Sequence, residues 1–128
     1  MRRLLQIACA AALAAACGCA SVEVSHDFDG VKVDGCEEPV AVVAVSNSGW
    51  YLFGVVPVIA GDPDYPRSFR FFSDTVTLDN NVKMLADTAR KEGAPNIANL
   101  TSRVRDDLAI GLFIFGRKMV FTSAVITK

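Results

Sequence analysis

The sequence predicts a small α+β domain in which a mostly antiparallel sheet carries one amphipathic helix packed on one face. Three observations lead to this fold class. Short apolar runs rich in β-branched residues predict strands, one segment from Leu78 has helical periodicity, and the order is strands, helix, strands. The chain has 128 residues, which is the usual size of one domain. We expect a single α+β domain over residues 39–128.

The segment that precedes this domain has two interpretations. From Val22 to Phe28, apolar and polar residues alternate, and Asp29-Gly30 follows as a two-residue turn. This pattern predicts a β-hairpin in which the first strand pairs with residues 31–33. The alternative is a flexible tether, so residues 17–38 are interpreted as a tether or a β-hairpin.

The next strand is predicted over Val40 to Val45, a continuous apolar run that is typical of a central strand. Ser46 to Gly49 has turn chemistry and is expected to end it. Gly61 to Pro66 is expected to form a surface loop, and Arg67 to Phe72 a strand or irregular aromatic packing.

Residues 50–60 read WYLFGVVPVIA and carry no charge. The segment is too short to span a bilayer, and Gly54 and Pro57 disfavour one continuous helix. One interpretation is a buried strand and loop that fill the core. The other is an exposed apolar loop that docks on a membrane or a partner, with Trp50, Tyr51, Leu52 and Phe53 as candidate interaction residues.

The helix is predicted to start at Leu78, because Thr77 can cap it and Asp79 suits the positive end of the helix dipole. Gly93 suits the residue that follows the helix. The predicted core-facing residues are Leu78, Val82, Leu85, Ala86 and Ala89.

Two strands should follow the helix. Residues 98–105 alternate between apolar and polar side chains, and Asp106-Asp107 is expected to turn the chain. Residues 110–115 are apolar, Gly116 to Lys118 interrupts the pattern, and Met119 to Ile126 is apolar on both faces. This last run predicts an interior strand.

The amino terminus has the pattern of a cleavable signal. Arg2 and Arg3 precede a small-apolar stretch over residues 4–16, and no acidic residue occurs before Glu23. The apolar stretch is shorter than the roughly 20 residues that a transmembrane helix needs. We expect residues 1–16 to be removed.

The end of this segment, Ala-Ala-Ala-Cys-Gly-Cys, resembles the lipobox of bacterial lipoproteins. The resemblance implies that the mature chain begins at a lipidated Cys17, or alternatively at Cys19, with fatty acyl chains such as palmitate. With Cys17 lipidated, Cys19 and Cys36 can pair as a disulfide in an oxidising compartment. With Cys19 lipidated, Cys36 is a single thiol.

The mature part resembles small uncharacterised bacterial lipoproteins with a GWYLF-type segment. The residues that carry this resemblance are Gly49 to Phe53, Pro57, Gly61-Asp62 and the strand Val120 to Val125. The resemblance implies an envelope location and no particular activity.

No pattern in the sequence points to catalysis, and we expect no enzyme, no cofactor and no metal. His26 is the only histidine, whereas a zinc site needs three or four ligands. The least implausible nucleophile is Cys36, but the adjacent Glu37 and Glu38 disfavour its thiolate. Without residues 1–16, eleven Lys and Arg face 14 Asp and Glu, a net charge of about −3 that gives no indication of nucleic-acid binding.

The sequence therefore predicts a membrane-anchored envelope lipoprotein that is a non-enzymatic binding or scaffolding module. Its expected partners are the membrane, through the N-terminal lipid, and an envelope protein. The domain should face the periplasm, with the outer membrane favoured because no acidic retention signal follows either cysteine. The alternatives are a sensor or accessory subunit that docks on a membrane partner through residues 50–60, and a small enzyme.

Overall fold

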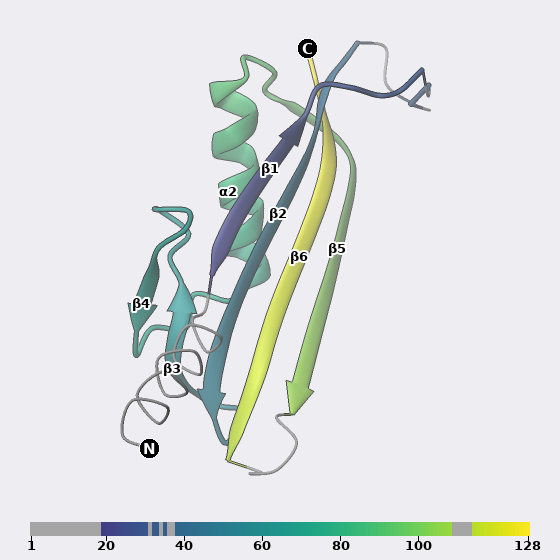
Figure 1. Ribbon diagram of the computed structural model, residues 1–128. Coiled ribbons are helices and arrows are strands. Elements are labelled where there is room, and N and C mark those ends of the chain that lie inside the picture. The colour runs from purple at the N-terminus through teal and green to yellow at the C-terminus, as the bar shows by residue number, and fades with distance from the viewer. Residues whose placement is uncertain (1–18, 31, 34, 36–37, 109–113) are drawn as a thin grey trace, which may run out of the picture.

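The computed structural model of the protein describes residues 19–30, 32, 33, 35, 38–108 and 114–128. A long, twisted antiparallel sheet carries helix α2 (Leu78–Lys91) on one face (Figure 1). The strands are β1 (Ala20–Ser25), β2 (Pro39–Leu52), β3 (Val56–Gly61), β4 (Phe69–Phe71), β5 (Asn96–Leu108) and β6 (Phe115–Thr127). The predicted α+β fold with one helix on a mostly antiparallel sheet is confirmed.

Strand β2 organises the sheet, whose order is β4-β3-β2-β6-β5. On one edge, β2 pairs with β6 along nearly its whole length. On the other edge, β1 pairs with the first half of β2 and β3 with the second half. The predictions of a central strand at Val40 to Val45 and an interior strand at Met119 to Ile126 are both confirmed, because β2 and β6 each have neighbours on both sides.

The main core lies between the sheet and α2. Met84, Leu85 and Ala89 of the helix pack against Val43 and Val45 of β2, together with further buried residues of the sheet. A smaller cluster under the other half of the sheet joins Tyr51, Ala60, Val76 and Val120. None of the helices in the described part of the chain has the length and hydropathy of a membrane-spanning segment.

The prediction for the helix ends is confirmed. Thr77 caps α2, its side chain accepting a hydrogen bond from the Asn80 backbone N–H. Gly93, just beyond the end, has a φ of +68°, a backbone conformation that glycine adopts readily.

The predicted core-facing side of α2 is wrong in part, because Leu78 is 46% exposed and Asn81 is buried in its place. Asn81 points inward because its Nδ2 donates to the Val120 carbonyl oxygen at 2.9 Å.

The predicted partner of the first strand is wrong. The Asp29-Gly30 turn forms, with positive φ at both residues, but β1 pairs with β2 in the register Val22↔Val45. Of residues 31–33, Val31 lies outside the described residues and the other two are not in a strand. β1 is therefore an integral strand of the sheet and not a free tether, because β2 offers it a longer apolar partner than residues 31–33.

Two predicted turns are also wrong. Ser46 to Gly49 continues β2, and Asp106 and Asp107 lie within β5 opposite Lys118 and Arg117. Both acidic residues face basic residues across the strands, and such opposite-charge pairs stabilise a sheet. Residues 116–118 accordingly belong to β6, whereas most of the apolar run 110–115 lies outside the described residues.

Candidate functional site

Cys19, the first described residue, is fastened directly to β2. Its carbonyl oxygen accepts a hydrogen bond from the Ser48 backbone N–H at 2.9 Å, and its own N–H donates to Ser48 Oγ at 3.3 Å. The next residue, Ala20, is fully buried and starts β1. The Cys19 side chain is exposed. Cys19 is therefore held directly at the edge of the sheet, with no linker between it and β1.

The other two cysteines of the mature chain, Cys17 and Cys36, lie outside the described residues. Lipidation at Cys17 or Cys19 and a disulfide between Cys19 and Cys36 therefore stay predictions.

Gly61 marks the point where β1 and β3 meet end to end along β2. A Cβ atom built on Gly61 would lie 2.5 Å from the carbonyl carbon of Cys19 and closer still to the Ala20 backbone nitrogen and Asn47 Oδ1. Non-bonded carbon atoms normally approach to about 3.5–4.0 Å. Only glycine therefore allows the start of β1 to approach the end of β3 this closely. The surface loop expected from Gly61 to Pro66 thus begins at a buried junction.

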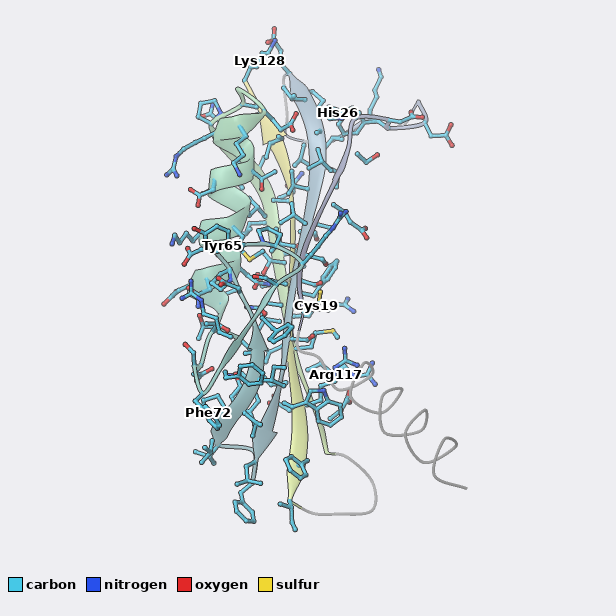
Figure 2. All side chains as sticks on the ribbon, turned by 60° about the vertical axis from the view of Figure 1, so that its left-hand side comes forward. Cys19, His26, Tyr65, Phe72, Arg117 and Lys128 are labelled. Carbon is cyan, nitrogen blue, oxygen red and sulfur yellow. The ribbon has the colours of Figure 1, made fainter. Side chains whose placement is uncertain are left out.

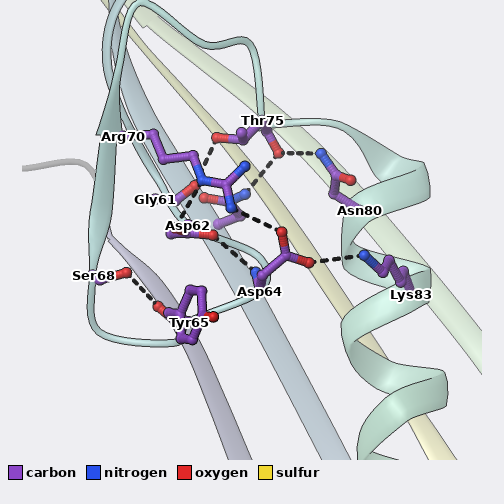
Figure 3. A network of polar contacts seen from close by, with 10 residues as sticks. Gly61, Asp62, Asp64, Tyr65, Ser68, Arg70, Thr75, Asn80 and Lys83 are labelled. Carbon is purple, nitrogen blue, oxygen red and sulfur yellow. Dashed lines mark hydrogen bonds and ion pairs between the residues drawn. The ribbon is translucent and has the colours of Figure 1, made fainter.

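A polar network holds this junction against α2 (Figure 3). Arg70 donates from Nε to Asp62 at 2.7 Å and from Nη2 to Asp64 at 2.8 Å. Lys83 of α2 donates to the second oxygen of Asp64 at 2.8 Å. The hydrogen bonds from Lys83 and Arg70 lower the pKa of Asp64. Burial would raise the pKa of Asp62, but the hydrogen bonds from Arg70 and from the Asp64 backbone N–H outweigh it and lower that pKa.

Thr75 extends the network into the core. Its hydroxyl donates to the Gly61 carbonyl oxygen at 2.6 Å, and its own carbonyl oxygen accepts from Asn47 and Asn80. The carboxylate oxygens of Asp62 and Asp64 all accept hydrogen bonds from protein donors. This arrangement indicates a structural role, and we call Asp62, Asp64, Arg70 and Lys83 the clamp. Sequence reasoning missed this clamp, because nothing local in the chain indicates that Arg70 or Lys83 turns toward the loop.

The uncharged segment 50–60 forms a β-hairpin that is buried in one part and exposed in another, and docking through its exposed part stays a prediction. Tyr51 is only 3% exposed and belongs to the core, whereas Trp50 and Leu52 are half-buried. At the turn, Phe53 is 66% and Val55 76% exposed. Of the four candidate interaction residues, the structure therefore places only Phe53 fully on the surface.

Ile114 and Phe115, at the start of β6, lie beside this hairpin. Leu52 is paired with Phe115, and the Phe53 backbone N–H donates to the Ile114 carbonyl oxygen at 2.6 Å. Both Ile114 and Phe115 are exposed. We call the five exposed side chains at this end of the sheet the apolar tip: Phe53, Val55, Val56, Ile114 and Phe115.

Exposed phenylalanines continue from the apolar tip along the neighbouring edge strand. Phe69, Phe71 and Phe72 are all exposed, and Phe69 and Phe71 stack edge to face with ring centroids 5.4 Å apart. The Phe72 backbone N–H donates to the Val58 carbonyl oxygen, near the tip. Figure 2 shows Phe72 and Arg117 toward one end of the molecule, with His26 and Lys128 at the other.

A pocket of about 260 Å³ lies immediately above the apolar tip. Its charged side chains are two carboxylates and two cations, and its lining is Tyr51, Gly54, Asp106, Asp107, Gly116, Arg117 and Lys118. The Tyr51 hydroxyl donates to Asp74 at 2.6 Å, and the Lys118 ammonium lies 5.7 Å from the Tyr51 ring centroid. Burial, with a further contribution from the carboxylate of Asp74, raises the pKa of Tyr51. The hydroxyl therefore stays neutral, and the described side chains that line the pocket carry balanced charge.

His26 lies far from these features and bonds through Nε2 to Glu92 at the end of α2, at 2.9 Å. Within residues 19–30, 38–108 and 114–128, no three His, Cys, Asp or Glu side chains gather as metal ligands.

Compared with protein-family models, with curated proteins and with solved structures, the chain has no significant match.

Proposed function

We propose that this chain is a lipid-anchored protein of the bacterial cell envelope, and that its folded body is a non-enzymatic binding or scaffolding module facing the periplasm. The observation that carries the proposal is the pattern of residues 1–19: two arginines, a short apolar stretch, small residues and then cysteine. Acyl chains on such a cysteine embed in the bilayer, and two or more of them give stable anchoring, at about 0.8 kcal/mol per buried methylene.

The arrangement of the charged side chains supports binding or scaffolding over catalysis. Asp62, Asp64, Arg70 and Lys83 bond to one another and hold a loop to the helix. A catalytic acid, base or nucleophile instead has to face a substrate with a proton to give or take.

Intact mass spectrometry of the membrane fraction tests the anchor. The mature chain should begin at Cys17 or Cys19 and carry acyl mass, and the double variant Cys17→Ser, Cys19→Ser should lose that mass and stable anchoring. Cys36→Ser is the matched control and should keep both. An unmodified mature chain in the soluble fraction would contradict the proposal, and separation of inner and outer membranes by density tests the favoured outer-membrane location.

A further inference from the structure

We infer that the apolar tip is a second membrane contact, which inserts into the surface of the same bilayer that holds the N-terminal lipid. The inference rests on the proposed function for the position of the lipid. It concerns a different part of the chain, and it assigns a lipid surface as the occupant of the tip.

The apolar tip consists of exposed side chains that all favour an apolar environment over water. Its five side chains are aromatic or branched aliphatic. They come from the end of the β2–β3 hairpin and from the start of β6, which are joined by the hydrogen bond from the Phe53 N–H to the Ile114 carbonyl oxygen. Contiguous exposed apolar patches are uncommon on soluble monomers and mark interaction sites. The exposed Phe71 and Phe72 enlarge the apolar surface on the β4 side.

The position of the anchor places this surface within reach of the bilayer. β1 runs antiparallel to β2, so the Cys19 end of β1 faces the tip. Cys19 is level with Ser48, and the five residue steps from Ser48 to Phe53 span about 17 Å at about 3.4 Å per residue. If Cys17 is acylated, the residue that carries the lipid lies two residue steps before Cys19, a connection of at most about 7 Å.

This connection is shorter than the distance by which the tip projects beyond Cys19. When the sheet axis is perpendicular to the membrane, the connection is too short to keep the tip outside the bilayer. The tip therefore enters the bilayer surface. Burying the tip in the interface also removes its apolar side chains from water.

The charges above the tip match the headgroup layer. In the strand register next to the tip, Asp106 lies opposite Lys118 and Asp107 opposite Arg117, and Asp107 also forms an ion pair with Arg105. Long cationic side chains lie along apolar surface while their charged ends reach polar groups, here lipid phosphates. The carboxylates and cations around the pocket thus face headgroups that carry both signs of charge, with the apolar side chains below them.

The test uses the full acylated chain, reconstituted into vesicles of phosphatidylethanolamine and phosphatidylglycerol in which a fraction of the acyl chains is brominated. Trp50 is the only tryptophan, so Trp50→Phe gives a background without indole fluorescence. Phe53→Trp then reports on the tip, and Leu100→Trp is the control. Leu100 is 50% exposed, much like Val56 at 49%, but it lies in β5 on the far half of the sheet.

Brominated lipid should quench the tryptophan at position 53 several-fold more strongly than the one at position 100. Val55→Trp, at the most exposed position of the tip, gives the same reading if Phe53→Trp disturbs folding. Adding Val56→Asp should reduce the quenching at position 53 while the chain stays with the vesicles, because a charge at the tip opposes insertion.

The outcomes separate the two proposals. Chains that float with the vesicles but show equal, weak quenching at both positions would overturn the inference about the tip and leave the anchor intact. A tip that stays in water on pure lipid but is shielded in native membranes would assign it to a protein partner instead of lipid. An acylated chain that fails to float contradicts the proposed function, and with it the placement of the tip.

Discussion

Replacing Gly61 by alanine should loosen the attachment of β1 to the sheet. The added methyl group would collide with the start of β1 on one side and with Asn47 on the other. Two of the three nearest atoms belong to the backbone of Cys19 and Ala20, so rotation of a side chain cannot relieve the overlap. Either β1 or β3 has to move.

The size of the effect follows from the cost of overpacking, which is about 1–3 kcal/mol and occasionally more. Urea denaturation of a small domain has a slope of about 1–3 kcal/mol per molar, so the midpoint should fall by about 1 M. Gly116→Ala is the matched control, because a Cβ there would meet its nearest atoms at 3.8 Å. The control should unfold close to the parent midpoint.

Hydrogen exchange locates the effect. In Gly61→Ala, the amides of β1 should exchange faster than in the parent, whereas those in the centre of β6 should change only with global stability. Equal midpoints for Gly61→Ala and Gly116→Ala would refute the reasoning, as would a loss of stability with β1 protection unchanged.

Three further predictions concern packing and ionisation. Leu85→Ala should lower the free energy of unfolding by about 2–5 kcal/mol, since Leu85 is fully buried. Val56→Ala, at an exposed position, should change it by no more than about 0.5 kcal/mol. Equal losses for the two variants in urea unfolding would contradict the assignment of Val56 to an exposed tip. Tyr51→Phe should cost about 0.5–1.5 kcal/mol at neutral pH by removing the hydrogen bond to Asp74. Because the folded pKa of Tyr51 is raised, the stabilising contribution of Tyr51 should be fully present below about pH 10 and fall above it. This alkaline loss of stability should be smaller in Tyr51→Phe. The folded pKa of Asp62 is lowered, so the stabilising contribution of Asp62 should be present above about pH 3.9 and be lost as the pH falls further. Asp62→Asn should therefore flatten the acid part of the curve of stability against pH, and an unchanged curve would show that the network contributes nothing.

The parts of the fold that local signals determine could be predicted from the sequence. The helix is an example, since Thr77 and Gly93 act on neighbouring backbone groups and specify its ends wherever it packs. The continuous apolar runs in β2 and β6 likewise identify interior strands from burial on both faces.

Long-range contacts decided what the sequence could not. Gly49 and Asn47 have turn chemistry, yet a Cβ on Gly49 would meet the Ile59 carbonyl oxygen at 2.9 Å, and the Asn47 side chain donates to Thr75. Both residues serve contacts with segments distant in sequence. The apolar tip has the same origin, because pairing of β2 with β6 brings Phe53 beside Ile114, 61 residues away.

The end-to-end arrangement of β1 and β3 along β2 has a mechanical consequence. A pull on the chain from the Cys19 side, directed toward the apolar tip, acts along the axis of β1. The hydrogen bonds between β1 and β2 run across that axis, so the six register pairs from Ala20↔Asn47 to Ser25↔Val42 resist sliding together. If the same strand were pulled from its Ser25 end and away from the sheet, the bonds would open one after another, as in a zipper. The direction in which the chain enters the sheet thus suits the proposed lipid anchor, because a pull on that anchor loads the hydrogen bonds between β1 and β2 together.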